Sequence, residues 1–367
     1  GGSNGGGYAV NFGQRPFAHS APSGFKALCT TNLPTPAIAD GSDYFDTKLY
    51  TTETTISGLS FSPDWVWLKR RSQAADNGVY DTVRGVNKLL YPNATNSEET
   101  GGGVTAFNSD GFDLGTNALF KGGGHSFVSW NWDAGSSTTT NTTGGTSASV
   151  RANPTAGFSI VAWSGHGSGS TTVGHGLSTA PELIILKGRS NSGAWVVGSD
   201  YLGWGNRLEL NTTSAKGSAS ADFNSTAPTS SVFTVGSNQG TGDKVAYCIS
   251  PVAGYSAVGS YDGNGSTDGR FIHTGFRVAY LILKCHTTTE LWMVHDNARD
   301  PDNVVSKLLQ PHTNDAEIDS VSNYGVDFLS NGFKFRSSSN RNNGSGQSYL
   351  YYAVAENPFQ ANGGLAR

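Results

Sequence analysis

Three stretches of the chain carry the same succession of apolar and polar positions. Each begins with a continuous apolar run that ends in lysine, and the three runs are Trp65–Lys69, Leu183–Lys187 and Tyr280–Lys284. In an extended chain such a run is apolar on both faces, because successive side chains point to opposite sides. The pattern therefore predicts a central strand that is covered on both sides.

The features that follow each run also recur in one order. An aspartate comes 12, 13 and 12 positions after the lysine, at Asp81, Asp200 and Asp296. A basic–leucine step and a strand-like segment follow. Each stretch closes on an aromatic-rich segment, at Phe127–Trp132, Val245–Cys248 and Tyr349–Val354. A repeat of roughly 100 residues is domain-sized and longer than a solenoid or propeller unit.

We therefore predict an all-β protein, a tandem array of three homologous β-sandwich domains behind an extended N-terminal connector. Short strands separated by Gly/Asn turns favour the sandwich. The tract 136–145 has neither charge nor apolar residues, which is typical of a linker. The predicted segments are a strand at Tyr8–Phe12 with a proline-rich connector (1–43), repeat 1 (44–135), a Ser/Thr/Gly linker (136–152), repeat 2 (153–254), and repeat 3 with the tail (255–367).

Composition narrows the class of protein. The formal net charge is −4 and no basic stripe occurs, which disfavours nucleic-acid binding. No apolar run approaches 18 residues, which disfavours membrane insertion. The three cysteines, Cys29, Cys248 and Cys285, fall at non-equivalent repeat positions, so we expect buried free thiols. Since the chain begins without methionine, we expect a fragment or a processed product.

The repeated lysines and aspartates are the first candidates for chemistry. If a hairpin turns between them, the two side chains face each other across the strand pair. Three copies of one catalytic pair are improbable in a single chain, so we interpret them as structural ion pairs and predict no catalytic residue. The predicted pairs are Lys69–Asp81, Lys187–Asp200 and Lys284–Asp296.

Two weaker patterns suggest metal ligands. His166 and His175 flank a glycine-rich turn, but no third ligand stands nearby. Asp262, Asn264 and Asp268 alternate as in a calcium loop, yet that run lacks the glycine and glutamate that such loops need. We therefore favour surface histidines and a plain β-turn, and predict no cofactor.

Three aromatic residues lie close to loops. Trp163, Tyr201 and Trp204 are outside the continuous apolar runs. An exposed aromatic ring can stack on the face of a sugar, which makes these residues candidates for glycan binding. Packing in the core is the alternative fate of the two tryptophans.

Several segments resemble the C-terminal region of large bacteriophage virion proteins, especially tail-fibre and appendage proteins of phages that infect marine bacteria and cyanobacteria. The resembling segments are Ser23–Pro34, Tyr44–Tyr50, Asp81–Gly85, Val173–Leu177 and Phe328–Phe333. In addition, Val10–Phe17 is similar to the final strand of a SPRY-like domain that often precedes this region.

The resemblance implies a non-enzymatic structural protein on the virion surface: a tail fibre, appendage or outward decoration involved in host attachment. It implies that the partners are copies of the same chain, with a trimer favoured, other virion proteins, and a host cell-surface glycan. Two alternatives remain open, a virion-borne glycan depolymerase and a purely architectural cement protein.

Overall fold

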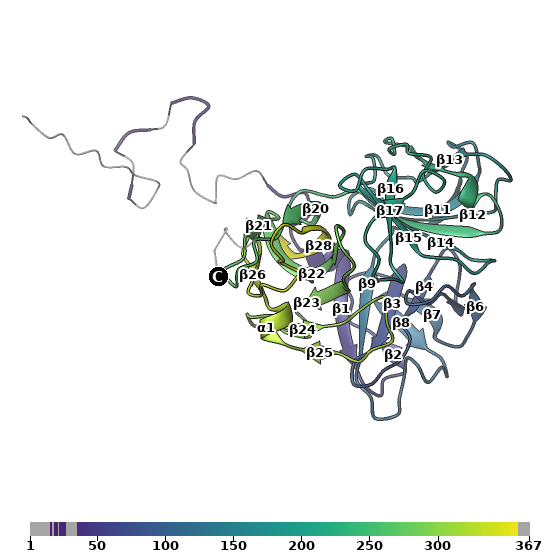
Figure 1. Cartoon of the computed structure of the whole chain (residues 1–367), viewed down its shortest axis with the longest axis horizontal. Helices are drawn as coiled ribbons and strands as arrows, with labels where there is room; N and C mark the ends of the chain where they lie inside the picture. The colour runs from purple at the N-terminus through teal and green to yellow at the C-terminus, as the bar shows by residue number, and fades with distance from the viewer. Residues whose placement is uncertain (1–14, 17, 21, 27–34, 359–367) are drawn as a thin grey trace, which may run out of the picture.

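The structure is a computed structural model that describes residues 15–16, 18–20, 22–26 and 35–358. Three β-rich lobes gather around a common centre (Figure 1). We name them unit 1 (40–135), unit 2 (136–254) and unit 3 (255–358). The all-β prediction is confirmed. The predicted strand at Tyr8–Phe12 and Cys29 lie outside the described residues, whereas Cys248 and Cys285 are buried free thiols as expected.

Unit 1 has a main antiparallel sheet with the strand order β1-β9-β3-β4, a second sheet β2-β8-β7, and a short ribbon β5-β6. Its elements are the 3-10 helix η2 (Gly41–Asp43), β1 (Phe45–Tyr50), β2 (Thr55–Ile56), β3 (Trp65–Arg70), β4 (Gly78–Asp81), β5 (Lys88–Leu89), β6 (Glu99–Thr100), β7 (Val104–Asn108), β8 (Gly111–Leu114) and β9 (Phe127–Trp132).

Unit 2 repeats this order as β12-β19-β14-β15 within a sheet that continues through β10-β11 on one side and β16-β17 on the other. Its elements are β10 (Thr138–Asn141), β11 (Ala148–Asn153), β12 (Phe158–Trp163), β13 (Thr171–Gly174), β14 (Leu183–Gly188), β15 (Val196–Ser199), β16 (Asn206–Glu209), β17 (Gly217–Ser218), β18 (Val232–Val235), η3 (Ser237–Gln239) and β19 (Lys244–Ile249).

Unit 3 has the matching main sheet β20-β28-β22-β23, with β21-β27-β26 as its second sheet. Its elements are β20 (Ser256–Asp262), β21 (Phe271–His273), β22 (Phe276–Cys285), β23 (Trp292–Asp296), β24 (Lys307–Leu308), β25 (Ile318–Asp319), the helix α1 (Val321–Tyr324), β26 (Val326–Leu329), β27 (Gly332–Phe335) and β28 (Ser348–Pro358).

The lysine-ended runs form β3, β14 and β22, and each lies inside its main sheet, between two other strands. Their apolar side chains are buried on both faces. In β3, Val66 and Leu68 pack with Phe112 of the second sheet, whereas Trp65 and Trp67 point to the other side. The prediction of a central strand covered on both faces is confirmed.

The second face of each main sheet packs against the other units in one shared core. The ring of Trp65 lies 4.4 Å from that of Trp132 in its own unit, and 5.5 Å and 4.5 Å from Phe158 and Tyr247 of unit 2. Tyr280 of unit 3 contacts Trp132 at 5.4 Å. One hydrophobic cluster thus includes residues of all three units. The repeats do not stand apart as domains in series, because in the described residues the inner faces of the three units are buried against one another.

Backbone hydrogen bonds join the units into a closed ring. At each seam, a loop amide of one unit donates to a carbonyl at the end of the next unit's lysine-ended strand. The three bonds run from Glu98 to Arg189 (2.7 Å), from Lys216 to His286 (3.0 Å), and from Glu317 to Arg71 (2.8 Å). The order is unit 1 to 2, unit 2 to 3, and unit 3 to 1. The chain therefore has approximate three-fold symmetry.

The segment predicted as a linker, 136–152, forms strands instead. β10 pairs with β11, and β11 extends the main sheet of unit 2 by pairing with β12. Ala148 and Val150 are buried, and Arg151 forms an ion pair of 2.6 Å with the buried Asp64 of unit 1. The linker interpretation is wrong because threonine-rich sequence suits an extended strand once a sheet edge is available.

Candidate functional site

The structure places the lysine and the aspartate of each predicted ion pair at opposite ends of their hairpin. Asp81 lies opposite Trp65 in the β3–β4 register, four positions from Lys69, which corresponds to about 13 Å along a strand. In unit 3, Asp296 lies opposite Tyr280 in the same way. The return strand starts to pair before the aspartate is reached, with Lys284 opposite Trp292 in unit 3, so the aspartate lies four positions further along its strand. The prediction is therefore wrong for Lys69–Asp81, Lys187–Asp200 and Lys284–Asp296.

The three lysines instead donate hydrogen bonds to backbone carbonyls. The Nζ atoms of Lys69, Lys187 and Lys284 lie 2.6, 3.1 and 2.6 Å from their acceptors. The acceptors are the carbonyl oxygens of Ala75, Thr95 and Cys285, respectively. Burial lowers the pKa of each of these lysines to about 8. Lys69 and Lys187 thereby tie the end of their strand to a loop, whereas Lys284 bonds within its own strand, to the carbonyl of the next residue.

The aspartates form a different constellation, first seen at the seam of units 1 and 2. The buried Arg84 donates to Asp81 Oδ2 at 2.5 Å and to Glu98 Oε2 at 3.1 Å. From unit 2, Arg189 contacts both carboxylate oxygens of Glu98, at 2.9 and 3.0 Å. The hydroxyl of Tyr247, also in unit 2, donates to Asp81 Oδ2 at 2.8 Å. Four charged side chains and a phenol thus cross this seam.

The seam of units 3 and 1 repeats the arrangement. Arg299 donates to Asp296 Oδ2 at 2.6 Å and to Glu317 Oε2 at 3.1 Å. From unit 1, Arg71 contacts Glu317 through two bonds of 2.8 and 2.9 Å. The indole of Trp130 donates to Asp296 Oδ2 at 2.9 Å. We call each set of two arginines, one aspartate and one glutamate a seam network.

The charges of a seam network depend on one another. Burial alone would raise the pKa of Glu98, but hydrogen bonds from Arg189 and the charge of Arg84 outweigh it and lower that pKa. Glu317 behaves in the same way beside Arg71 and Arg299. Removing one member would leave a buried charge without its partner, which is far more costly than removing an exposed ion pair.

The seam of units 2 and 3 lacks this network. Ser199 lies opposite Leu183, the position that Asp81 occupies in unit 1, and the buried Leu202 follows three residues later in place of an arginine. Lys216 and His286 stand where the other seams have glutamate and arginine, and only their backbone atoms bond. This seam is therefore held by apolar packing, by backbone hydrogen bonds, and by the indole of Trp292, which donates to the Glu209 carbonyl oxygen at 2.9 Å.

Three buried histidines lie in unit 3. Burial, with a smaller contribution from Arg299, lowers the pKa of His295 to about 3. Burial also lowers the pKa values of His286 and His312 to about 4, and the nearby charge of Lys284 acts in the same direction on both. All three rings are therefore neutral in the folded protein at neutral pH.

These histidines predict acid destabilisation. Their folded pKa values lie below the unfolded value of 6.5, so the unfolded chain binds more protons between about pH 4 and 6.5. The contribution of these histidines to the free energy of unfolding is fully present above pH 6.5, and it falls as the pH drops towards 4. Asp64 acts in the opposite direction, because burial raises its pKa to about 6. We expect a lower urea midpoint at pH 5 than at pH 7.5 and a smaller difference in His295→Gln; equal midpoints for the unmodified chain would contradict this.

The two candidate histidine ligands are used by the backbone. His175 is buried, contrary to the surface position expected, with Nε2 3.1 Å from the Thr229 carbonyl oxygen and Nδ1 accepting from the Leu177 amide. His166 Nε2 lies 3.3 Å from the Gly169 carbonyl oxygen. Across the described residues, no three His, Cys, Asp or Glu side chains gather as a metal site.

The calcium-like run is organised around an amide. Asn343 donates from Nδ2 to Asn264 Oδ1 at 2.9 Å and to the Ser266 carbonyl oxygen at 2.7 Å. Asp262 accepts from the hydroxyl of Ser348, and Asp268 forms an ion pair with Lys334. The Nδ2 atom of Asn343 therefore bonds to oxygens that a bound cation would need as ligands.

Two of the three aromatic candidates for glycan stacking are in the core. Trp163 is buried against Phe233, and Trp204 against Phe223. Only Tyr201 is exposed, at 45%. The carboxylate of Asp200, which the sequence nominated for an ion pair, accepts a hydrogen bond from the indole of Trp204 instead.

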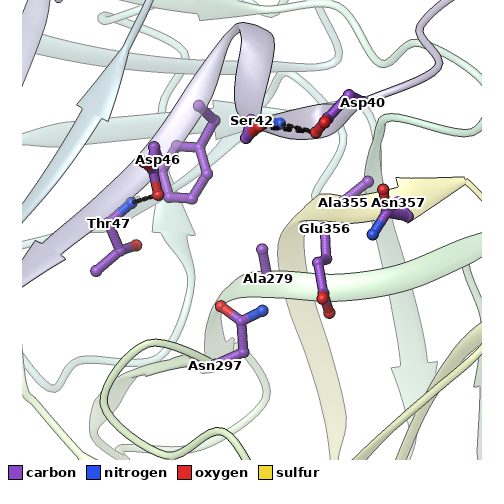
Figure 2. Close-up of a pocket in the computed structure, with 10 residues that line it drawn as sticks. Asp40, Ser42, Asp46, Thr47, Ala279, Asn297, Ala355, Glu356 and Asn357 are labelled. Atoms are coloured by element: carbon purple, nitrogen blue, oxygen red, sulfur yellow. Dashed lines mark hydrogen bonds between the residues drawn. The ribbon is translucent and has the colours of Figure 1, made fainter. Parts of the chain in front are cut away.

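A polar pocket of about 270 Å³ lies at the seam of units 1 and 3. Figure 2 shows the side chains that surround it, from the start of unit 1 and from two strands of unit 3. The polar residues of its lining are Asp40, Ser42, Asp46, Thr47, Asn297, Glu356 and Asn357. We call it the seam pocket.

A wider groove of about 620 Å³ lies at the seam of units 1 and 2. Five of its twelve lining residues are serines or threonines, and Trp163 forms part of the lining. The groove is open to solvent. Its polar lining includes Thr140, Thr146, Ser149, Ser164, Arg189 and Asp243.

Residues 40–358 match a family described as a domain of unknown function, DUF7483. The chain belongs to this family. The match spans all three units and their seams as one domain, in agreement with the shared core. No curated protein matches the chain. In the part of the DUF7483 domain that the structure describes, no helix has the length and hydropathy needed to cross a membrane.

Sequence reasoning missed the seam networks of this DUF7483 domain. A signal was present, because an arginine follows the aspartate by three residues in Asp81–Arg84 and in Asp296–Arg299. Unit 2 has Ser199 and Leu202 at these positions, which hides the motif from a search for features common to all three repeats. The glutamates come from loops with no linear pattern.

Proposed function

We propose that this chain is a non-enzymatic structural protein of a bacteriophage virion, displayed at the particle surface in a tail fibre, appendage or outward decoration, where it contributes to attachment to the host. The observation that carries the proposal is how the repeated charges are used. Asp81, Arg84 and Glu98 are engaged with one another and with unit 2, and their counterparts in unit 3 are engaged with unit 1.

Groups whose hydrogen bonds are fully used inside a seam hold an architecture together and are not free to act on a substrate. A closed ring of β units with a shared apolar core also suits a particle that must remain intact outside a cell. The single methionine leaves little side chain to oxidise.

A homotrimer is part of this proposal. The apolar faces of β3, β14 and β22 are buried within one chain and need no cover from a neighbouring subunit. Self-association would therefore use other surfaces, and light scattering after size-exclusion chromatography gives the mass directly.

The location is tested on purified particles. Peptides of this chain should appear in the mass spectrum of density-purified virions, and gold-labelled antibody should mark the particle surface. Free protein should compete with the particles for adsorption to host cells. Absence from the virions would overturn the proposal, whereas presence without competition would leave a cement protein in place of an attachment protein.

Incubation with host envelope polysaccharide tests the non-enzymatic part. We expect no increase in reducing ends over a heat-denatured control. Release of oligosaccharides would show instead that the chain is a glycan depolymerase.

A further inference from the structure

The seam pocket is built by segments that are distant in the sequence. Residues 40–47 of unit 1 form one wall, and Asn297, which follows β23, faces them from unit 3 together with the end of β28 (Figure 2). Gly41 makes the closure possible, because a Cβ atom at this position would lie 2.1 Å from the carbonyl oxygen of Ala355. The two units therefore meet here at backbone distance.

A β-bulge opens the pocket at this seam. The pairing of β22 with β28 shifts between Arg277 and Val278 and again between Val278 and Tyr280, which leaves Ala279 without a partner. The carbonyl of Ala279 accepts from the Asn297 amide at 3.0 Å instead. The matching pairings of β3 and β14 run without a shift. Bulges often occur beside binding sites, because they redirect the neighbouring groups.

Two of the three carboxylates of the pocket are neutralised by cations that lie outside its lining. Asp46 forms an ion pair of 2.7 Å with Lys48, and Glu356 one of 3.1 Å with Arg277. Asp40 accepts two hydrogen bonds from Ser42. Neither lysine nor arginine is part of the lining, so an anionic ligand would meet carboxylates and no cation. A neutral ligand fits this balance.

Polar groups on the pocket wall remain unused. Thr47 is only 8% exposed, and its hydroxyl has no hydrogen-bond partner. In Figure 2 this oxygen lies on the side of Thr47 that faces Ala279 and Asn297. The side-chain amides of Asn297 and Asn357 make no hydrogen bond to the described part of the chain. A buried hydroxyl without a partner costs stability unless a ligand or water supplies one.

We propose that the seam pocket binds one neutral sugar ring of the hexose type. A hexose presents adjacent hydroxyls that each donate and accept, which matches planar amides and carboxylates beside a threonine hydroxyl. The volume of about 270 Å³ lies just below the range of about 300–1,000 Å³ for pockets that bury drug-sized ligands, which suits a single ring and not a chain. This proposal rests on the proposed function and names the ligand class for attachment: a terminal or branching neutral sugar of a host glycan.

Saturation-transfer NMR on the full chain tests the pocket with glucose, galactose, mannose and N-acetylglucosamine, and with glucuronate as the charged comparison. We expect saturable binding of at least one neutral sugar and none of glucuronate. Thr47→Val keeps the shape and removes the hydroxyl, so it should weaken binding about tenfold. Thr140→Val makes the same change in the groove of units 1 and 2 and should leave binding unchanged.

Asn297→Ala gives a second variant of the pocket if Thr47→Val fails to fold, and a thermal melt identifies such a failure. No saturable binding of any neutral sugar would overturn the proposal, as would equal affinities for the unmodified chain and both pocket variants. If the protein adsorbs to host cells and no neutral sugar inhibits the adsorption, the proposed sugar binding by the seam pocket is overturned. The proposed function then still stands. If the chain binds a neutral sugar but is absent from virions, the proposed function is overturned and the sugar site still stands.

Discussion

Replacing Asp81 by alanine is expected to lower the free energy of unfolding by about 3–5 kcal/mol, because it removes one of the two carboxylates that the buried Arg84 contacts. Arg84 would lose its buried 2.5 Å contact with Asp81, and the hydroxyl of Tyr247 would lose its acceptor. Urea denaturation followed by tryptophan fluorescence measures the change. Asp296→Ala should give a loss of similar size at the opposite seam, since Arg299 and Trp130 stand in the same relation to it.

The chain contains its own control for this prediction. Ser199 occupies the equivalent position in unit 2 and is equally buried, but it pairs with no charge. Ser199→Ala should therefore cost about 1 kcal/mol or less. The double variant Asp81→Ser with Arg84→Leu copies the pair found in unit 2, and it should recover much of the loss, because no unpaired charge remains. Equal losses in Asp81→Ala and Ser199→Ala would show that the network does not stabilise the seam.

The sequence was sufficient to predict the central strands. In β3 the run from Trp65 to Leu68 is apolar at every position, which only a strand covered on both faces accommodates. The same logic holds for β14 and β22. Local pattern decides this question, because the alternation of side chains across a strand is a property of the backbone itself.

The register of the hairpins could not be predicted, because it depends on loop conformation. The spacing from lysine to aspartate is 12 residues in units 1 and 3 but 13 in unit 2. That single extra position already separates Asp200 from the true equivalent of Asp81, which is Ser199. An ion pair inferred from spacing alone needs a turn of known length, and these loops are too long to provide one.

The core shared by the three units also could not be predicted from the pattern of apolar residues. A strand that is apolar on both faces predicts that another layer covers each face. The pattern does not indicate which unit supplies that layer. Trp65 and Val66 are neighbouring apolar residues of the same run. Val66 faces the second sheet of its own unit, whereas Trp65 faces unit 2. The same limit hid the seam pocket, whose walls come from residues about 300 positions apart.

The shared core leads to a prediction about cooperativity. Trp65→Ala should lower the free energy of unfolding by about 3–5 kcal/mol, the cost of removing a large buried ring. Trp65 is 2% exposed, and its ring contacts those of Phe158 and Tyr247 in the next unit. Because these contacts cross a seam, the change should loosen more than one unit. Hydrogen exchange measured by mass spectrometry should show faster exchange in β3, β12 and β19 together.

Trp204→Ala is the matched control for that experiment. Trp204 is also buried, but its ring packs on Phe223 in a cluster that belongs to unit 2 alone. It should also be destabilising, with faster exchange confined to unit 2. If Trp65→Ala accelerated exchange only in unit 1 and the unmodified chain unfolded in three separate steps, the units would be independent domains. A single transition in which the effect of Trp65 spreads through the ring would show that the inner faces stabilise one another, because the described residues bury these faces in one shared core.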